Sequence, residues 1–227
     1  MPPPGFNPQS IHQFFDPLKF GTELGYALII LIFCLLVYWK TKEIYELTKH
    51  KGIKYFRFAF LFFGLSYAFR LILFIMIVGT SALDLYLPRH LVMPFSNLIV
   101  AYFSTLAILY LTYSIISKKI KNKHFMIFAN LLAITISLIA FLSRSPFIIS
   151  MIQLMILIGA SILNLIIYKK KISRTRILYF LITLFWLLNL FTTGRYIFLP
   201  FETQIIIYIL AIIIFAMIYH RVSKFTK

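Results

Sequence analysis

Charged residues, and acidic residues above all, are scarce in this chain of 227 residues. Six are Asp or Glu, all charged types together make up 13% of the sequence, and apolar types make up 61%. Soluble domains have about 25% charged and about 45–50% apolar residues. The chain has too few polar side chains to cover its own surface in water, which excludes a soluble globular domain and predicts an integral membrane protein.

Cysteine, glycine and proline are scarce as well. The single cysteine, Cys34, excludes a disulfide framework. Eight glycines and nine prolines exclude a collagen-like chain, and the excess of apolar residues excludes a disordered one.

Sequence patterns that mark common catalytic and cofactor sites are absent. The HExxH, GxSxG, P-loop and GxGxxG patterns do not occur. Haem held between helices needs histidines inside the apolar runs, and all five histidines lie outside those runs or at their ends. A retinal Schiff base needs a lysine within a run, and no run contains one. We therefore expect a protein that is not an enzyme and that binds no cofactor or metal.

Seven apolar runs approach or exceed the length of about 20 residues that a bilayer-crossing helix needs. They are apolar all round, whereas the strands of a membrane barrel alternate polar and apolar residues. The runs span residues 23–39, 55–78, 91–116, 125–142, 147–168, 177–197 and 201–219. We predict an all-α integral membrane protein, a seven-transmembrane-helix bundle over residues 23–219, with an extracytoplasmic N-terminal segment 1–22 and a short basic cytoplasmic tail 220–227.

Basic residues fall mainly on one side of these runs. Loops that stay in the cytoplasm carry such an excess of Lys and Arg. The prediction therefore places the N-terminus outside and the C-terminus in the cytoplasm, as in a multi-pass protein of a prokaryotic plasma membrane. Eighteen of the 23 basic residues lie on the predicted cytoplasmic side: Lys40, Lys42, Lys49, Lys51, Lys54, Arg57, Lys118, Lys119, Lys121, Lys123, Lys169, Lys170, Lys171, Arg174, Arg176, Arg221, Lys224 and Lys227.

The net charge of +17 is spread over these membrane-flanking segments. We assign it to attraction toward anionic lipid headgroups, worth about 1 kcal/mol per residue near the surface, and we expect no nucleic acid partner. The longest basic segment, residues 40–57, is also a candidate docking site for a cytoplasmic or membrane partner protein.

Arg70 is the most informative residue, because a charge deep within an apolar run needs a partner or a wet cavity. Glu23 and Glu202, at the outer ends of the first and last runs, are candidate counter-charges. Further polar groups lie at similar depth on other runs. The candidate ligand-binding residues are Arg70, Glu23, Asn97, Gln153, Trp186, Asn189 and Glu202. They predict a polar cavity facing outward, in which Arg70 either clamps the helices together or binds a ligand.

Other side chains within the runs add two expectations. Tyr67, Tyr102 and Trp186 lie deep enough to line the cavity, with core packing as the alternative. Asn130 and Asn164 lie at matched depth near the cytoplasmic side, which predicts a hydrogen bond between two helices.

Three functions fit this topology. The preferred one is a sensor or receptor-like protein, in which a small apolar or amphipathic ligand enters near Arg70 and helix shifts pass to a separate partner protein. The second is a small transporter or channel, although the broken helices that transporters favour are missing. The third is an accessory subunit of a membrane assembly, for which the sparse Gly and Ala in the runs are unfavourable.

Overall fold

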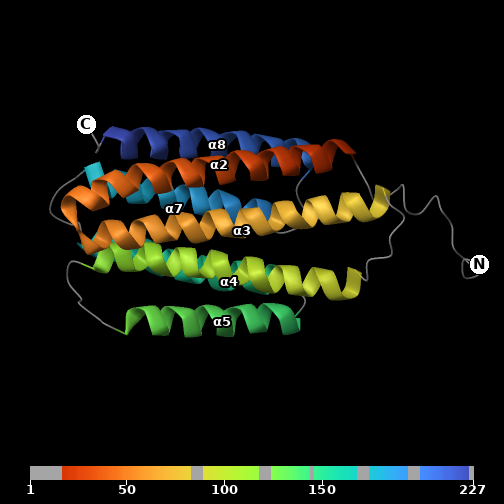
Figure 1. The fold of residues 1–227 in the computed structure, drawn as a ribbon, viewed down its shortest axis with the longest axis horizontal. Coiled ribbons are helices and arrows are strands. Elements are labelled where there is room, and N and C mark those ends of the chain that lie inside the picture. The colour runs from red at the N-terminus through yellow and green to blue at the C-terminus, as the bar shows by residue number, and fades with distance from the viewer. Residues whose placement is uncertain are drawn as a thin grey trace, which may run out of the picture.

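The computed structural model describes residues 17–82, 89–117, 124–143, 146–167, 174–193 and 200–224, and these form seven helices. Figure 1 shows them as one bundle of roughly parallel rods, which confirms the all-helical prediction. The helices are α2 (Pro17–Thr48), α3 (Lys51–Ala82), α4 (Arg89–Ile116), α5 (Phe125–Ser143), α6 (Pro146–Ile167), α7 (Arg174–Thr193) and α8 (Phe201–Lys224).

Six of these helices are long and apolar enough to cross a membrane, as in a multi-pass membrane protein. The exception is α7, whose described apolar stretch, Arg176–Leu190, is shorter. The predicted sixth run continues to residue 197, and residues 194–199 lie outside the described part of the chain. A seventh crossing and the orientation of the two ends therefore stay predictions.

The outer surface of the bundle is apolar, which a protein surrounded by water could not maintain. Helix α5 shows this most clearly, because small side chains face its neighbours and large ones face outward. Its buried positions include Ala129, Ala133, Ser137 and Ala140. Its exposed positions include Ile127, Phe128, Leu131, Leu138 and Leu142. Small residues at helix contacts and large ones toward lipid are the usual pattern in membrane bundles.

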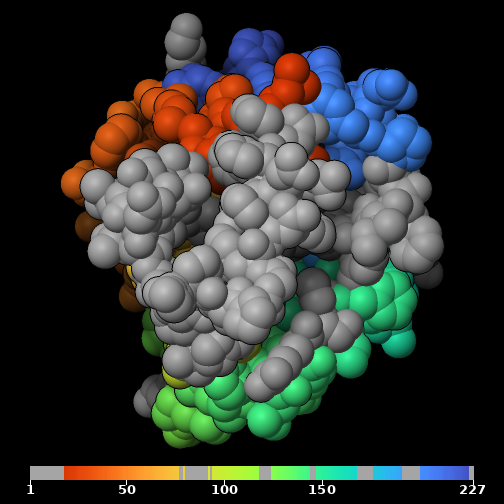
Figure 2. Space-filling model, turned by 90° about the vertical axis from the view of Figure 1, so that its right-hand side faces the viewer, coloured from red at the N-terminus to blue at the C-terminus, as the bar shows by residue number. Residues whose placement is uncertain are grey.

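Successive helices run in opposite directions, so the start of α2 and the end of α8 lie at opposite ends of the bundle (Figure 1). Helix packing follows a ring from α2 through α3, α4, α6, α7 and α8 back to α2, while α5 covers α4 and α6 from outside. Figure 2, which looks onto the end where α2 begins, shows α2 and α8 on one side and the green helices α5 and α6 on the other. Among the described residues, α3 and α7 meet across the ring through side chains alone.

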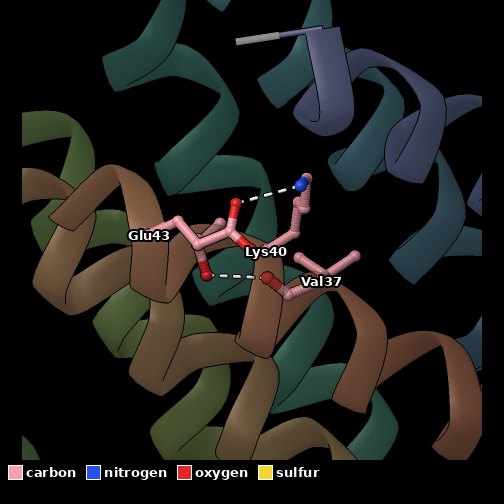
Figure 3. Close-up of polar contacts among 4 residues, drawn as sticks. Val37, Lys40 and Glu43 are labelled. Carbon is pink, nitrogen blue, oxygen red and sulfur yellow. Dashed lines mark hydrogen bonds and ion pairs between the residues drawn. The ribbon is translucent and has the colours of Figure 1, made fainter. Parts of the chain in front are cut away.

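The opposite end of the bundle, here called the basic end, carries ten described basic residues: Lys40, Lys42, Lys49, Lys51, Lys54, Arg57, Arg174, Arg176, Arg221 and Lys224. Helix α2 continues to Thr48, nine residues beyond the predicted end of the first run, and only residues 49–50 separate it from α3. Two lysine–glutamate pairs follow the helix surface there, Lys40–Glu43 at 2.9 Å (Figure 3) and Lys42–Glu46 at 3.8 Å. Such exposed pairs support a helix by only about 0.3–0.5 kcal/mol each.

Backbone geometry explains why α2 ends at Thr48. Lys49 has a φ of 50°, the left-handed conformation that often follows a helix, and its amide donates to the Tyr45 carbonyl at 2.8 Å. The ring nitrogen Nδ1 of His50 then accepts from the Gly52 amide at 3.1 Å and caps the start of α3. The connection between the first two predicted membrane helices is therefore a tight corner between α2 and α3.

Several expectations fall outside the described residues. These are the greater part of the N-terminal segment, residues 1–16, and the basic residues at 118–123, 168–173 and 225–227. The described helices extend beyond both ends of the predicted transmembrane domain, residues 23–219, since α2 begins at Pro17 and α8 extends to Lys224.

Close packing of α2 against α3 predicts the effect of a substitution at Gly64. An added Cβ at Gly64 would lie 3.1 Å from the Cβ of Cys34, which cannot rotate away. We expect Gly64→Val to reduce stability by about 1–3 kcal/mol and to lower the melting temperature in detergent by several degrees.

The matched control for this change is Gly159→Val in α6, where an added Cβ has no neighbouring atom within 4 Å. This control is expected to melt within a degree or two of the wild type. Equal melting temperatures for the two variants would contradict the close helix approach.

Candidate functional site

A polar cluster connects three helices in the half of the bundle away from the basic end. Asn189 of α7 is buried, and its Oδ1 accepts hydrogen bonds from the hydroxyls of Tyr26 in α2, at 2.9 Å, and Tyr67 in α3. Its own amide donates to the Phe185 carbonyl at 3.4 Å, one turn earlier. One carbonyl oxygen thus holds α7 to two other helices.

Aromatic rings and two charges surround this cluster. Tyr208 of α8 stacks on Tyr26 with ring centroids 4.3 Å apart. The guanidinium carbon of Arg70 lies 5.0 Å from the centre of the Tyr67 ring, in a cation–π contact. Glu23 lies one turn before Tyr26 on α2 and is half-buried. The cluster therefore extends to α8 and to the start of α2.

A small cavity lies beside Asn189, between α3, α4, α6 and α7. Its volume is about 30 Å³, enough for about two water molecules or one small ion. Ligand pockets for drug-sized molecules measure about 300–1,000 Å³, so the expected apolar or amphipathic ligand does not fit here. The polar residues that line it are Ser66, Tyr67 and Arg70 from α3, Ser104 from α4, Gln153 from α6, and Trp186 and Asn189 from α7.

Gln153 holds the α4 and α6 side of this cavity. Its amide nitrogen lies 2.6 Å from the Ser104 hydroxyl and 3.2 Å from the Thr105 hydroxyl, and donates to both. Because Gln153 and Thr105 are buried, these bonds have no competition from lipid or water. They fix the amide of Gln153 at the cavity wall.

Trp186 brings an unsatisfied donor to the same cavity. Its indole nitrogen is buried and has no hydrogen-bond partner among the described residues, and 3% of the residue surface is exposed. An indole N–H can only donate. A buried donor without a partner costs about 1–3 kcal/mol, so an acceptor within reach of this nitrogen would stabilise the bundle.

The structure brings together four of the seven predicted site residues, Arg70, Gln153, Trp186 and Asn189, at one cavity. Glu23 lies beside the cluster, one turn before Tyr26 on α2. The remaining two do not line the cavity: Asn97 is half-buried on α4, and Glu202 is exposed at the start of α8. Among the described residues, the ion pairs lie at the basic end, and neither glutamate forms one with Arg70.

Other residues at the site were not identified from the sequence. Tyr26, Ser66 and Ser104 belong to it, yet an isolated Ser or Tyr in an apolar run gives no signal of its own. For Tyr67 and Trp186 the sequence allowed either cavity lining or core packing. Both residues line the cavity.

The expected bond between Asn130 and Asn164 is wrong. Asn130 accepts instead from the Tyr102 hydroxyl at 2.7 Å, and neither residue is among those that line the cavity. The Oδ1 of Asn164 has no partner in the described structure. Similar depth put the two asparagines at one level, but the rotation of each helix decides which side chains meet.

Acidic, histidine and cysteine side chains do not gather in the described part of the chain. No three of them lie close enough to hold a metal ion there. The arrangement offers a small polar cavity, lined by one residue whose buried donor has no described partner, next to a hydrogen bond network.

Comparison with other proteins places the chain in a family. It is 33% identical over 232 aligned residues to an uncharacterised protein of Archaeoglobus fulgidus, and the match covers 99% of both chains. No family model matches the sequence, and no solved structure matches it significantly. The chain belongs to the same family as the Archaeoglobus protein.

The two tyrosine bonds to Asn189 predict its contribution to stability. Asn189→Leu leaves two buried hydroxyls without their acceptor, which we expect to cost about 2–4 kcal/mol. Denaturation in detergent, followed by circular dichroism, measures the loss. Adding Tyr26→Phe and Tyr67→Phe to Asn189→Leu should restore most of the lost stability, because the two hydroxyls without an acceptor are then removed.

Asn164→Leu is the matched control, since it removes a buried asparagine whose Oδ1 has no described partner. This variant is expected to be as stable as the wild type or slightly more stable. If Asn189→Leu behaved in the same way, Asn189 would not connect the helices.

Proposed function

We propose that this member of the Archaeoglobus protein's family is a non-enzymatic membrane sensor of receptor-like type. Its ligand site is the polar cavity beside Asn189, and occupancy of that site changes how α7 packs against α2 and α3. Every described helix belongs to the bundle. We therefore expect a separate protein to bind the basic end and respond to the change in packing.

The observation that supports this proposal is the position of Asn189 between the cavity and two other helices. The residue lines the cavity and also accepts from Tyr26 and Tyr67. Because α3 and α7 meet through side chains alone, their spacing depends on those side chains. A ligand that competes for Tyr67 or moves Trp186 would therefore shift α7 with little opposition from backbone packing.

The proposal includes a topology and a location. Ten described basic residues lie at the basic end, so we place that end in the cytoplasm by the positive-inside rule, next to anionic headgroups. The cavity then faces outward, and the relative from Archaeoglobus fits the plasma membrane of a prokaryote. The partner protein would contact the basic end, where Lys51 and Lys224 are exposed.

The two other functions remain separate hypotheses with different readouts. A transporter or channel would move a solute across liposomes. An accessory subunit would copurify with a stoichiometric membrane partner and bind no solute. The polar cavity favours the sensor over the accessory subunit, because an accessory subunit needs no site for a solute.

A thermal-shift screen against ions, amino acids, nucleotides and lipids tests the proposed site. At about 100 times its dissociation constant, a ligand adds about 2.7 kcal/mol, or roughly 5–10 °C in melting temperature for a chain of this size. We expect at least one small polar solute to do so for the wild type and to lose the effect in Arg70→Leu. Lys51→Leu is the matched control, because it removes a charge from the exposed start of the same helix.

Helix movement is measured separately with that solute. Spin labels at Lys51→Cys on α3 and at Phe180→Cys on α7, where Phe180 is 60% exposed, report the spacing of these two helices in a Cys34→Ala background. A sensor predicts a changed distance distribution when the solute binds. Binding with an unchanged distribution would refute the sensor, and solute flux in liposomes would favour the transporter.

A further inference from the structure

We infer that Arg57 and Lys49, at the corner between α2 and α3, form a binding site for the phosphate group of an anionic membrane phospholipid. The site lies at the basic end, away from the cavity beside Asn189, so it does not depend on the proposed sensor. It is supported by an arginine without a described counter-charge, a second cation at the same aromatic ring, and the depth of both in the bundle.

Arg57 lies on the second turn of α3, against the side of α2 that carries Tyr38 and Tyr45. Its guanidinium carbon is 4.6 Å from the centre of the Tyr38 ring and 5.6 Å from the centre of the Tyr45 ring. These cation–π contacts hold the guanidinium against both rings. An aromatic face has no oxygen, so the contacts leave the N–H groups of Arg57 without an oxygen acceptor.

Arg57 also has no acidic partner in the described part of the chain. Glu43 pairs with Lys40 instead (Figure 3). Glu46 pairs with Lys42. The Nε of Arg57 is buried and has no hydrogen-bond partner among the described residues, while the side chain as a whole is half-buried.

A phosphate group satisfies this arginine better than water does. Water would accept the hydrogen bonds of Arg57, whereas an anion also offsets its charge. The guanidinium carries its donors in a planar fork that binds two phosphate oxygens at once. The contacts with the two tyrosine rings hold that fork in place before the anion binds.

Lys49 brings a second positive charge to the same place. Its Nζ lies 5.9 Å from the centre of the Tyr45 ring, and the Arg57 guanidinium lies 5.6 Å from the same point. The backbone of Lys49 is held there by its left-handed φ of 50° and by the bond from its amide to the Tyr45 carbonyl. Two cations at one ring repel each other, and an anion near both removes that repulsion.

The depth of the site favours a lipid over a soluble phosphate. Tyr38 is near the end of the first predicted apolar run, and Arg57 is near the start of the second. Trp39, which follows Tyr38 and is 59% exposed, has the amphipathic ring that is typical of the membrane–water interface. The guanidinium therefore lies where apolar residues give way to lysines, at the level of the lipid headgroups.

Melting of the full-length protein in a neutral detergent, titrated with phosphatidylglycerol, tests the site. The lipid should raise the melting temperature along a saturating curve, because it binds the folded state. Native mass spectrometry of the same samples should show one lipid retained per chain at the lowest effective concentration. Glycerophosphoglycerol, the same headgroup without acyl chains, should give no shift, and equal stabilisation by it would replace the lipid with a soluble phosphodiester and overturn the inference.

Variants of Arg57 separate its fork of donors from its charge. Arg57→Leu should raise the half-saturating lipid concentration roughly tenfold or more, as expected for loss of a charge-assisted contact. Arg57→Lys keeps the charge but not the fork, and should raise that concentration by a smaller factor. The matched control is Arg221→Leu, which removes a half-buried arginine from α8 at the same end and should keep the wild-type value.

Lys49→Gln provides a second test that does not disturb the packing of α2 against α3, because Lys49 is exposed. It should weaken lipid binding, whereas Lys224→Gln, which removes an exposed lysine from α8, should not. This pair stands even if Arg57→Leu fails to fold.

Two results would overturn the phosphate site. One is a wild-type protein that phosphatidylglycerol does not stabilise along a saturating curve. The other is equal weakening, or no weakening, in the variants of Arg57 and Lys49 and in their controls on α8, which would leave only diffuse attraction between the basic end and anionic lipid.

Discussion

Polar groups inside a bilayer have no water to bond with, so each must find its partner within the bundle. In this protein the constraint falls most heavily on Asn189, whose carbonyl oxygen serves the hydroxyls of Tyr26 and Tyr67. Two consecutive helices, α2 and α3, are held at one point to α7, which is distant from them in sequence. The ring of helices, the side-chain contact between α3 and α7, and the small cavity between them all adjoin this point.

The apolar side chains of the bundle are distributed as expected for a protein surrounded by lipid. Small side chains such as those of Ala129 and Ala133 face neighbouring helices, and large ones cover the outside. Since lipid gives no hydrophobic drive for helices to associate, close contact and internal hydrogen bonds supply the specificity. Gly64, which lets α3 approach Cys34 on α2, belongs to the same scheme.

The proposed function concerns the buried donor for which packing provides no described partner. Trp186 keeps a buried N–H without a described acceptor, in a cavity that carries the charge of Arg70. A purely structural bundle would gain stability by placing an apolar side chain there. The polar network of Asn189 and Gln153 surrounds this donor, so whatever occupies the cavity is in contact with several helices at once.

Sequence alone determined the helices and the residue types at each depth, because apolar run length is a local property of the chain. It thereby identified Arg70, Gln153, Trp186 and Asn189, which meet at the cavity. It did not determine that Asn130 bonds Tyr102 rather than Asn164, that Asn97 and Glu202 lie away from the cavity, or that the cavity is so small. Those features depend on the rotation of each helix about its axis, and only contacts between helices set that rotation.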